Sequence, residues 1–185
     1  MNMIARIAIT AALTCSLTAC QSVPEKADVE QARATIDQHE KESLEKLYAR
    51  EPGAKAEIEG AVGHAVFRVK AVNAVLLVGQ QGNGVLIEHG TGKRTYMLML
   101  NAGTGPGVGY RQMAQIIAFK SQAAIDQFKL GDTAGFDLGV NGSLGTTTGA
   151  KSIDPLVEFW FVNEEGFAVQ AYWGGTTYLV DPDLN

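Results

Sequence analysis

The sequence predicts an α+β fold: a largely antiparallel β-sheet or barrel-like sandwich with an N-terminal helical layer and one further helix. Residues 28–61 are rich in charge and place apolar residues at helical spacing. Residues 64–180 instead contain short apolar and β-branched runs, separated by glycine and polar turns. Strands and crossover helices do not alternate regularly, which disfavours a doubly wound parallel sheet.

The first twenty residues predict a lipoprotein signal. Arg6 precedes an apolar run that ends at Leu17, and this run is shorter than the about 20 residues that span a hydrocarbon core. Leu17-Thr18-Ala19-Cys20 matches a lipobox, so we expect cleavage of residues 1–19 and lipidation of Cys20. The alternative is an ordinary signal peptide with a chance cysteine.

A lipid on Cys20 would keep the mature chain on a membrane, because several acyl chains together anchor stably. Gln21 is not the aspartate that favours inner-membrane retention, so we expect the periplasmic face of the outer membrane. Cys15 leaves with the signal, and no thiol then remains for a disulfide, a metal or a nucleophile. The excess of 20 acidic over 15 basic residues gives no electrostatic reason to expect nucleic-acid binding.

The mature chain is expected to be a short lipidated tether, residues 20–27, followed by one domain over residues 28–185. Asp28 can cap a helix that ends before Glu51-Pro52-Gly53, and a second short helix is expected over residues 54–61. Glu40 interrupts the apolar stripe of the first helix. We expect this helix to pack on its own domain rather than on a membrane.

The remaining elements follow from local composition. A third helix is expected over residues 121–129, and hairpin turns over residues 88–93 and 163–166. The candidate strands are residues 65–70, 74–80, 84–88, 94–100, 108–119, 135–144, 156–162, 167–173 and 176–180.

The glycine-rich segments do not meet the requirements of a phosphate loop. Gly92-Lys93 is preceded by Ile87 where a P-loop has glycine, and Arg94 stands where serine or threonine would hold magnesium. Residues 103–109 lack G-x-G-x-x-G spacing and lead into no helix. We therefore predict that the glycines, including Gly79, Gly82 and Gly84, serve bends and close backbone approach, and that alanine at any of these three lowers the thermal midpoint.

Catalytic and metal-binding patterns are also missing from the sequence. His39, His64 and His89 are more than twenty residues apart and form no metal-binding spacing. Ser143 lacks the G-x-S-x-G elbow of a hydrolase nucleophile. We predict a protein that is not an enzyme and that needs no cofactor or metal.

Several basic residues lie in or beside the predicted strands. Arg68 and Lys70 are two positions apart, so in a strand both side chains point to one face, and Lys93 and Arg94 extend from the predicted hairpin turn. If the sheet gathers these four, they form a lipid-binding patch for anionic head groups. The alternative is scattered solubilising charge.

With its elements in this order, the chain resembles the SYLF domain family, in its bacterial lipoprotein branch, over residues 54–180. The matching segments are residues 65–67, 78–86, 109 with 118–119, 121–125 and 139–140. Arg68, Val78 and Arg111 depart from the residues that are common in the family at these positions.

The resemblance implies a lipid-binding domain; phosphoinositide binding and actin regulation are described for eukaryotic members, and only a general lipid or envelope association transfers to a bacterial envelope protein. We therefore expect a membrane-tethered, lipid-binding lipoprotein. Its partners would be the membrane through the anchor and an anionic phospholipid or another envelope protein. The alternative is a structural interaction module whose only lipid is its own anchor.

Overall fold

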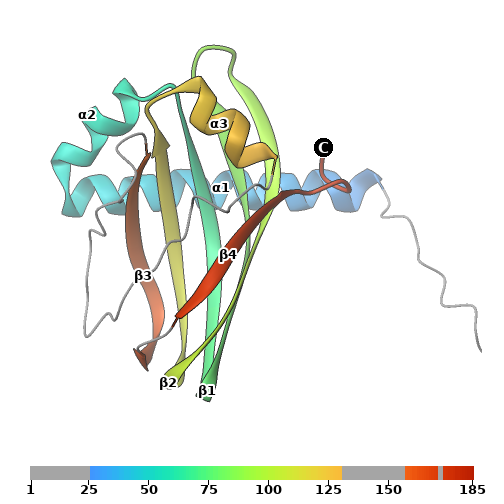
Figure 1. The fold of residues 1–185 in the computed structure, drawn as a ribbon. Helices are drawn as coiled ribbons and strands as arrows, with labels where there is room; N and C mark the ends of the chain where they lie inside the picture. The colour runs from blue at the N-terminus through green and yellow to red at the C-terminus, as the bar shows by residue number, and fades with distance from the viewer. Residues whose placement is uncertain (1–25, 131–156, 171–172) are drawn as a thin grey trace, which may run out of the picture.

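The computed structural model describes residues 26–130, 157–170 and 173–185 (Figure 1). These ranges hold three helices and four strands, an α+β fold with an antiparallel sheet, as predicted. In chain order they are α1 (Lys26–Arg50), α2 (Pro52–Gly60), β1 (Gly63–Glu88), β2 (Lys93–Phe119), α3 (Gln122–Lys129), β3 (Val157–Gln170) and β4 (Trp173–Val180). In this part of the chain, none of the helices combines the length and the apolar character that crossing a membrane requires.

Strands β1 and β2 form a long hairpin that is bent in the middle. They pair from Gly63 with Phe119 to Glu88 with Lys93, and the register shifts between Val75 and Leu77. β2 pairs with β3 over residues 107–119 and with β4 over residues 97–104. The bend divides each of the two long strands into two segments, which we call its arms, and both arms belong to the curved sheet (Figure 1).

Two glycines allow the arms of β1 to touch. A Cβ atom built on Gly82 would lie 2.6 Å from the carbonyl oxygen of Arg68, and one on Gly84 would lie 2.2 Å from that of Val66. Real Cβ atoms essentially never come so close, so both positions require glycine. Gly79 has open space around the same position. The predicted packing role is therefore supported for Gly82 and Gly84, and the expectation that alanine at Gly79 is costly loses its basis.

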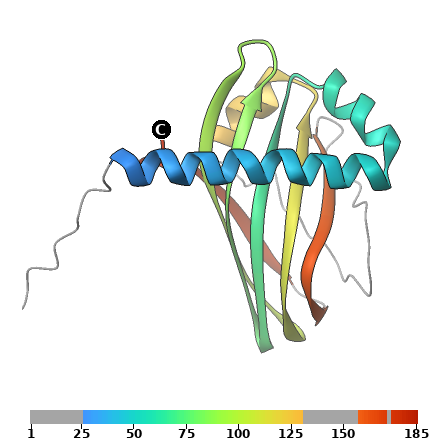
Figure 2. The ribbon, with the colours of Figure 1, turned by 180° about the vertical axis from the view of Figure 1, so that it is seen from behind.

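Helix α1 lies across one face of the sheet (Figure 2). Its buried residues are Ile36, His39, Glu40, Ser43 and Leu47. Leu47 packs with α2 and with Val66, Ile116 and Trp160 of the sheet, while Ile36 packs on Val85 and Tyr96. The predicted packing of this helix on its own domain is confirmed.

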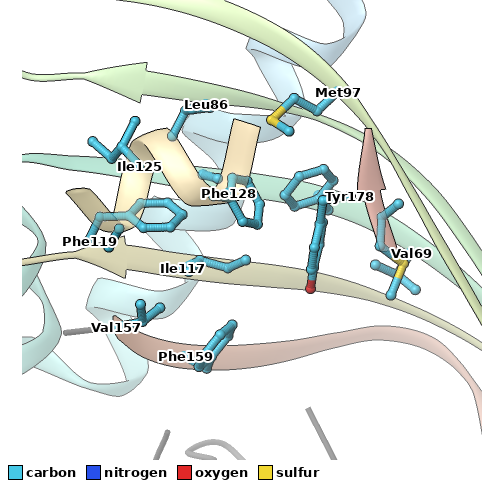
Figure 3. Packing of buried hydrophobic residues seen from close by; sticks show 14 of the residues in the cluster. Val69, Leu86, Met97, Ile117, Phe119, Ile125, Phe128, Val157, Phe159 and Tyr178 are labelled. Atoms are coloured by element: carbon cyan, nitrogen blue, oxygen red, sulfur yellow. The ribbon is translucent and has the colours of Figure 1, made fainter. Parts of the chain in front are cut away.

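The opposite face of the sheet holds the main core, which α3 closes (Figure 3). Ser121 caps α3 by accepting a hydrogen bond from the backbone N–H of Ala124 at 3.2 Å. The helix then inserts Phe128 between Phe119 and Tyr178, with ring centroids 4.9 and 4.6 Å away. Alternate residues of β1 therefore point to opposite faces of the sheet, one set toward α1 and the other toward the core that α3 closes.

The structure corrects several predicted boundaries. Residues 163–166 do not form a hairpin turn: β3 continues through them, and the register shift opposite Gln112 and Met113 is a β-bulge. The three strands predicted within residues 65–88 are one bent strand, as are the two within residues 94–119. The predicted strand at residues 135–144, the signal peptide, Cys20 and Ser143 lie outside the described residues.

Candidate functional site

Farther along the strands, no other helix or strand of the described residues covers the face on which α1 lies (Figure 2). Val72 lies six positions after Val66, on the same face, and pairs with Tyr110. Leu77 and Leu100 belong to this face by the same alternation from Val85 and Tyr96. The five side chains of what we call the open face are large, apolar and exposed: Val72 53%, Leu77 67%, Leu100 48%, Val108 67% and Tyr110 43%.

The open face ends at the bend of β1. Val75 and Leu76 form this bend and are also exposed. Val75 has a φ of 61°, a left-handed conformation that is unusual for a β-branched residue. Exposed apolar side chains gathered at one end of a sheet are typical of surfaces that contact a membrane, a ligand or another protein.

The four predicted lipid-binding cations do not form one cluster. Arg68 and Lys70 are both exposed and flank the buried Val69, so they do share one face, as predicted. Arg94 pairs with Ile87, whose backbone lies beside Gly63, which places Arg94 roughly 16 Å along the strand direction from Arg68. Only Arg68 and Lys70 therefore lie beside the open face.

Carboxylates already engage two of these cations. Arg94 donates a hydrogen bond of 2.7 Å to Asp37 of α1 and lies 4.0 Å from Glu40. Arg68 lies 3.9 Å from Glu164, which also accepts a hydrogen bond of 3.1 Å from Lys46. Two cations, Arg68 and Lys46, therefore share the Glu164 carboxylate.

A hollow of about 50 Å³ lies between α1 and the sheet. It is lined by Thr35, Ile36, His39, Val66, Arg68 and Asn83. His39 is 9% exposed, and its Nδ1 lies 2.7 Å from the hydroxyl of Ser43. Its Nε2 has no hydrogen-bond partner among the described residues. Burial lowers the pKa of His39, and the nearby Glu164 carboxylate opposes this only in part, so the ring is neutral at neutral pH.

The other two histidines join α1 to the end of the sheet. Glu40 Oε1 lies 3.1 Å from Nε2 of His64, whose Nδ1 lies 2.7 Å from Nε2 of His89. Nδ1 of His89 lies 2.8 Å from the carbonyl oxygen of Ala61, which can only accept. These three contacts form a continuous hydrogen-bonded path from Glu40 of α1 through both imidazoles to the backbone at Ala61.

Sequence reasoning missed both histidine arrangements. Glu40, which broke the apolar stripe, is 5% exposed and lies on the buried side of α1. His39, Glu40 and Ser43 all lie on that buried side. Their spacing along the helix was the signal in the sequence that could have revealed these arrangements. Ser43 is fully buried, so its contact with His39 orients the imidazole and does not present a nucleophile to solvent. Among the described residues, no group of three or more His, Cys, Asp or Glu side chains has a metal-binding arrangement.

Comparison with known proteins finds a relative that matches most of the chain. No protein-family model matches the sequence. The chain is 30% identical over 160 residues to Beta cell expansion factor A of Aeromonas veronii. The match includes 83% of this chain and 59% of that protein, so the chain spans about three fifths of its relative's length. The comparison therefore shows similarity to Beta cell expansion factor A over most of this chain.

Proposed function

We propose that this chain is a non-enzymatic lipid-binding module of the bacterial cell envelope, tethered through a lipid on Cys20, and that its open face contacts the lipid. The single observation that carries the proposal is the exposed apolar surface of Val72, Leu77, Leu100, Val108 and Tyr110. The resemblance of residues 54–180 to the SYLF domain family supports lipid as the ligand, and we propose membership of that family. The tether leads to α1, which crosses the face that continues into the open face.

The energetics suit reversible contact with a bilayer. Complete burial of a valine or leucine side chain contributes about 1.5–3 kcal/mol, so five roughly half-exposed side chains contribute at most about 4–8 kcal/mol. A single myristoyl chain binds membranes with an association constant of about 10⁴ M⁻¹, which is of similar size. The open face would therefore add to the anchor on Cys20 without replacing it.

Charge at the edge of the open face favours an anionic phospholipid. Lys70 is exposed between Arg68 and Val72 along β1, where its ammonium group can reach head groups while its stem lies on apolar surface. Each such cation near an anionic surface contributes about 1 kcal/mol. Because Lys93 and Arg94 lie at the other end of the sheet, we assign head-group contact to Arg68 and Lys70. We propose the periplasmic face of the outer membrane as the location.

The test is co-sedimentation of the chain from Gln21 onward with phosphatidylglycerol vesicles. This chain lacks acyl groups and keeps every helix and strand that the structure describes. Replacing both Leu77 and Val108 by glutamine should weaken binding at least about tenfold. The matched control replaces Val62 and Leu130, exposed apolar residues outside the open face, and should bind like the unmodified chain. Equal binding by both variants, or none by the unmodified chain, would favour the alternative interaction module that binds an envelope protein.

A further inference from the structure

The hollow beside α1 contains a buried donor without an acceptor. In neutral His39, Nδ1 can accept from the Ser43 hydroxyl at 2.7 Å, and Nε2 then carries the ring proton. This N–H has no partner among the described residues, although the side chain is nine-tenths buried. A buried donor without an acceptor costs about 1–3 kcal/mol, so an acceptor from outside the chain is favoured here.

The other polar groups around the hollow are also suited to an anion. Arg68 and Asn83 line it and can donate, whereas the hydroxyl of Thr35 is already used as a donor to the Gln31 carbonyl at 2.9 Å. Lys46 and Arg68 share the charge of Glu164, and Lys70 is exposed on the same face. Two cations, Arg68 and Lys46, and two carboxylates, Glu164 and Glu42, act on His39, so these charges balance and the donors that line the hollow are what favour an anion. Its volume of about 50 Å³ admits one or two oxygen atoms and excludes a bulky group.

The position of the hollow relates it to the open face. Arg68 is followed along β1 by Lys70 and Val72 on the same side of the strand, and Val72 lies roughly 13 Å beyond Arg68. Asn83 and Leu77 also lie on one side of β1, because they are six positions apart and side chains alternate along a strand. A phospholipid has its phosphate within about this distance of the start of its acyl chains.

We infer that the hollow of His39, Arg68 and Asn83 binds an oxygen of a phosphate group, which His39 Nε2 and the Arg68 guanidinium hold. The source is a lipid head group if its acyl chains lie on the open face, and free phosphate otherwise. The lipid source rests on the proposed function, whereas phosphate binding in the hollow does not.

The experiment follows the ring nitrogens of His39 by NMR in the ¹⁵N-histidine-labelled chain from Gln21 onward. Two probes are titrated: inorganic phosphate and a short-chain phosphatidylglycerol below its micelle concentration. A saturable shift of His39 Nε2 with either probe supports the site. If phosphatidylglycerol acts at least about tenfold more tightly than phosphate, the source is lipid; equal affinities identify free phosphate. His64 and His89 provide internal references, since both lie outside the hollow.

Variants separate the site from the proposed function. Arg68→Gln should weaken the response of His39 at least about tenfold and Arg68→Lys less, while Lys55→Gln, an exposed cation on α2, should have no effect. No saturable shift with either probe would overturn the inference, and vesicle binding that still depends on Leu77 and Val108 would then leave the proposed function standing. Phosphate binding without any vesicle binding would support the hollow and contradict the proposed function.

Discussion

At the scale of single residues, glycine in β1 has different roles at positions that look alike in sequence. Gly79, Gly82 and Gly84 lie within six positions of one another. Only Gly82 and Gly84 face the other arm of the strand at backbone contact distance. The sequence allowed the prediction that these glycines serve packing, but the contacts come from Arg68 and Val66, fourteen and eighteen positions earlier, so sequence alone could not assign them.

Replacement of Gly84 by alanine should destabilise the fold by about 1–3 kcal/mol, because the methyl group would overlap the Val66 carbonyl and the Phe67 ring. Gly79→Ala is the matched control and should change the free energy of unfolding by less than about 0.5 kcal/mol. Urea denaturation of both variants measures the difference. Equal effects at the two positions would mean that the arms of β1 do not touch.

His39 should make stability depend on pH. Burial lowers its pKa below the 6.5 of a free imidazole, so the unfolded chain takes up a proton more readily than the folded one. This contribution to stability is complete above about pH 6.5 and is lost as the pH falls from there through the lowered pKa. Relative to the unmodified protein, His39→Gln should therefore show a flatter decline in the urea midpoint below pH 6.5. Parallel declines in the two proteins would show that His39 does not titrate differently on folding.

At the scale of elements, local signals located helix ends well and strand ends poorly. Pro52 and Gly53 end α1 where predicted, and Ser121 begins α3, because capping and proline act over a few residues. Asn163-Glu164-Glu165-Gly166 has the composition of a turn, yet β3 runs through it, since pairing with the distant Gln112 and Met113 decides the backbone path. Element type was predictable here, and long-range pairing was not.

The docking of α1 depends on a polar contact as well as on Leu47. Glu40→Gln keeps the shape of the side chain but removes the carboxylate that contacts His64 at 3.1 Å and lies 4.0 Å from Arg94, so we expect a loss of about 1.5–3 kcal/mol in the free energy of unfolding. Glu45→Gln, on the exposed side of the same helix, should change stability by less than about 0.5 kcal/mol. Thermal unfolding at pH 7 compares them. If Glu40→Gln were as stable as Glu45→Gln, the Glu40 carboxylate would not contribute to the docking of α1.

At the scale of the whole molecule, the candidate site exists because α1 covers only part of the sheet face on which it lies. α1 crosses the strands on the side nearer the β1–β2 turn, and no other helix or strand of the described residues covers that face toward the bend of β1 (Figure 2). Sequence reasoning predicted a lipid-facing sheet surface and chose four cations to mark it. It could not locate the apolar part, because Val72 and Val66 look equivalent until the position of α1 is known.

The most direct test of lipid contact through the open face is fluorescence from a probe placed on it. The chain from Gln21 onward contains no cysteine, so Leu77→Cys can carry a single polarity-sensitive nitrobenzoxadiazole label, with Thr91→Cys in the β1–β2 turn as the control. On addition of phosphatidylglycerol vesicles, the label at position 77 should shift to the blue and be quenched by lipids brominated on their acyl chains, while the label at position 91 should do neither. An unchanged spectrum at position 77, under conditions in which the chain sediments with the vesicles, would contradict lipid contact through the open face.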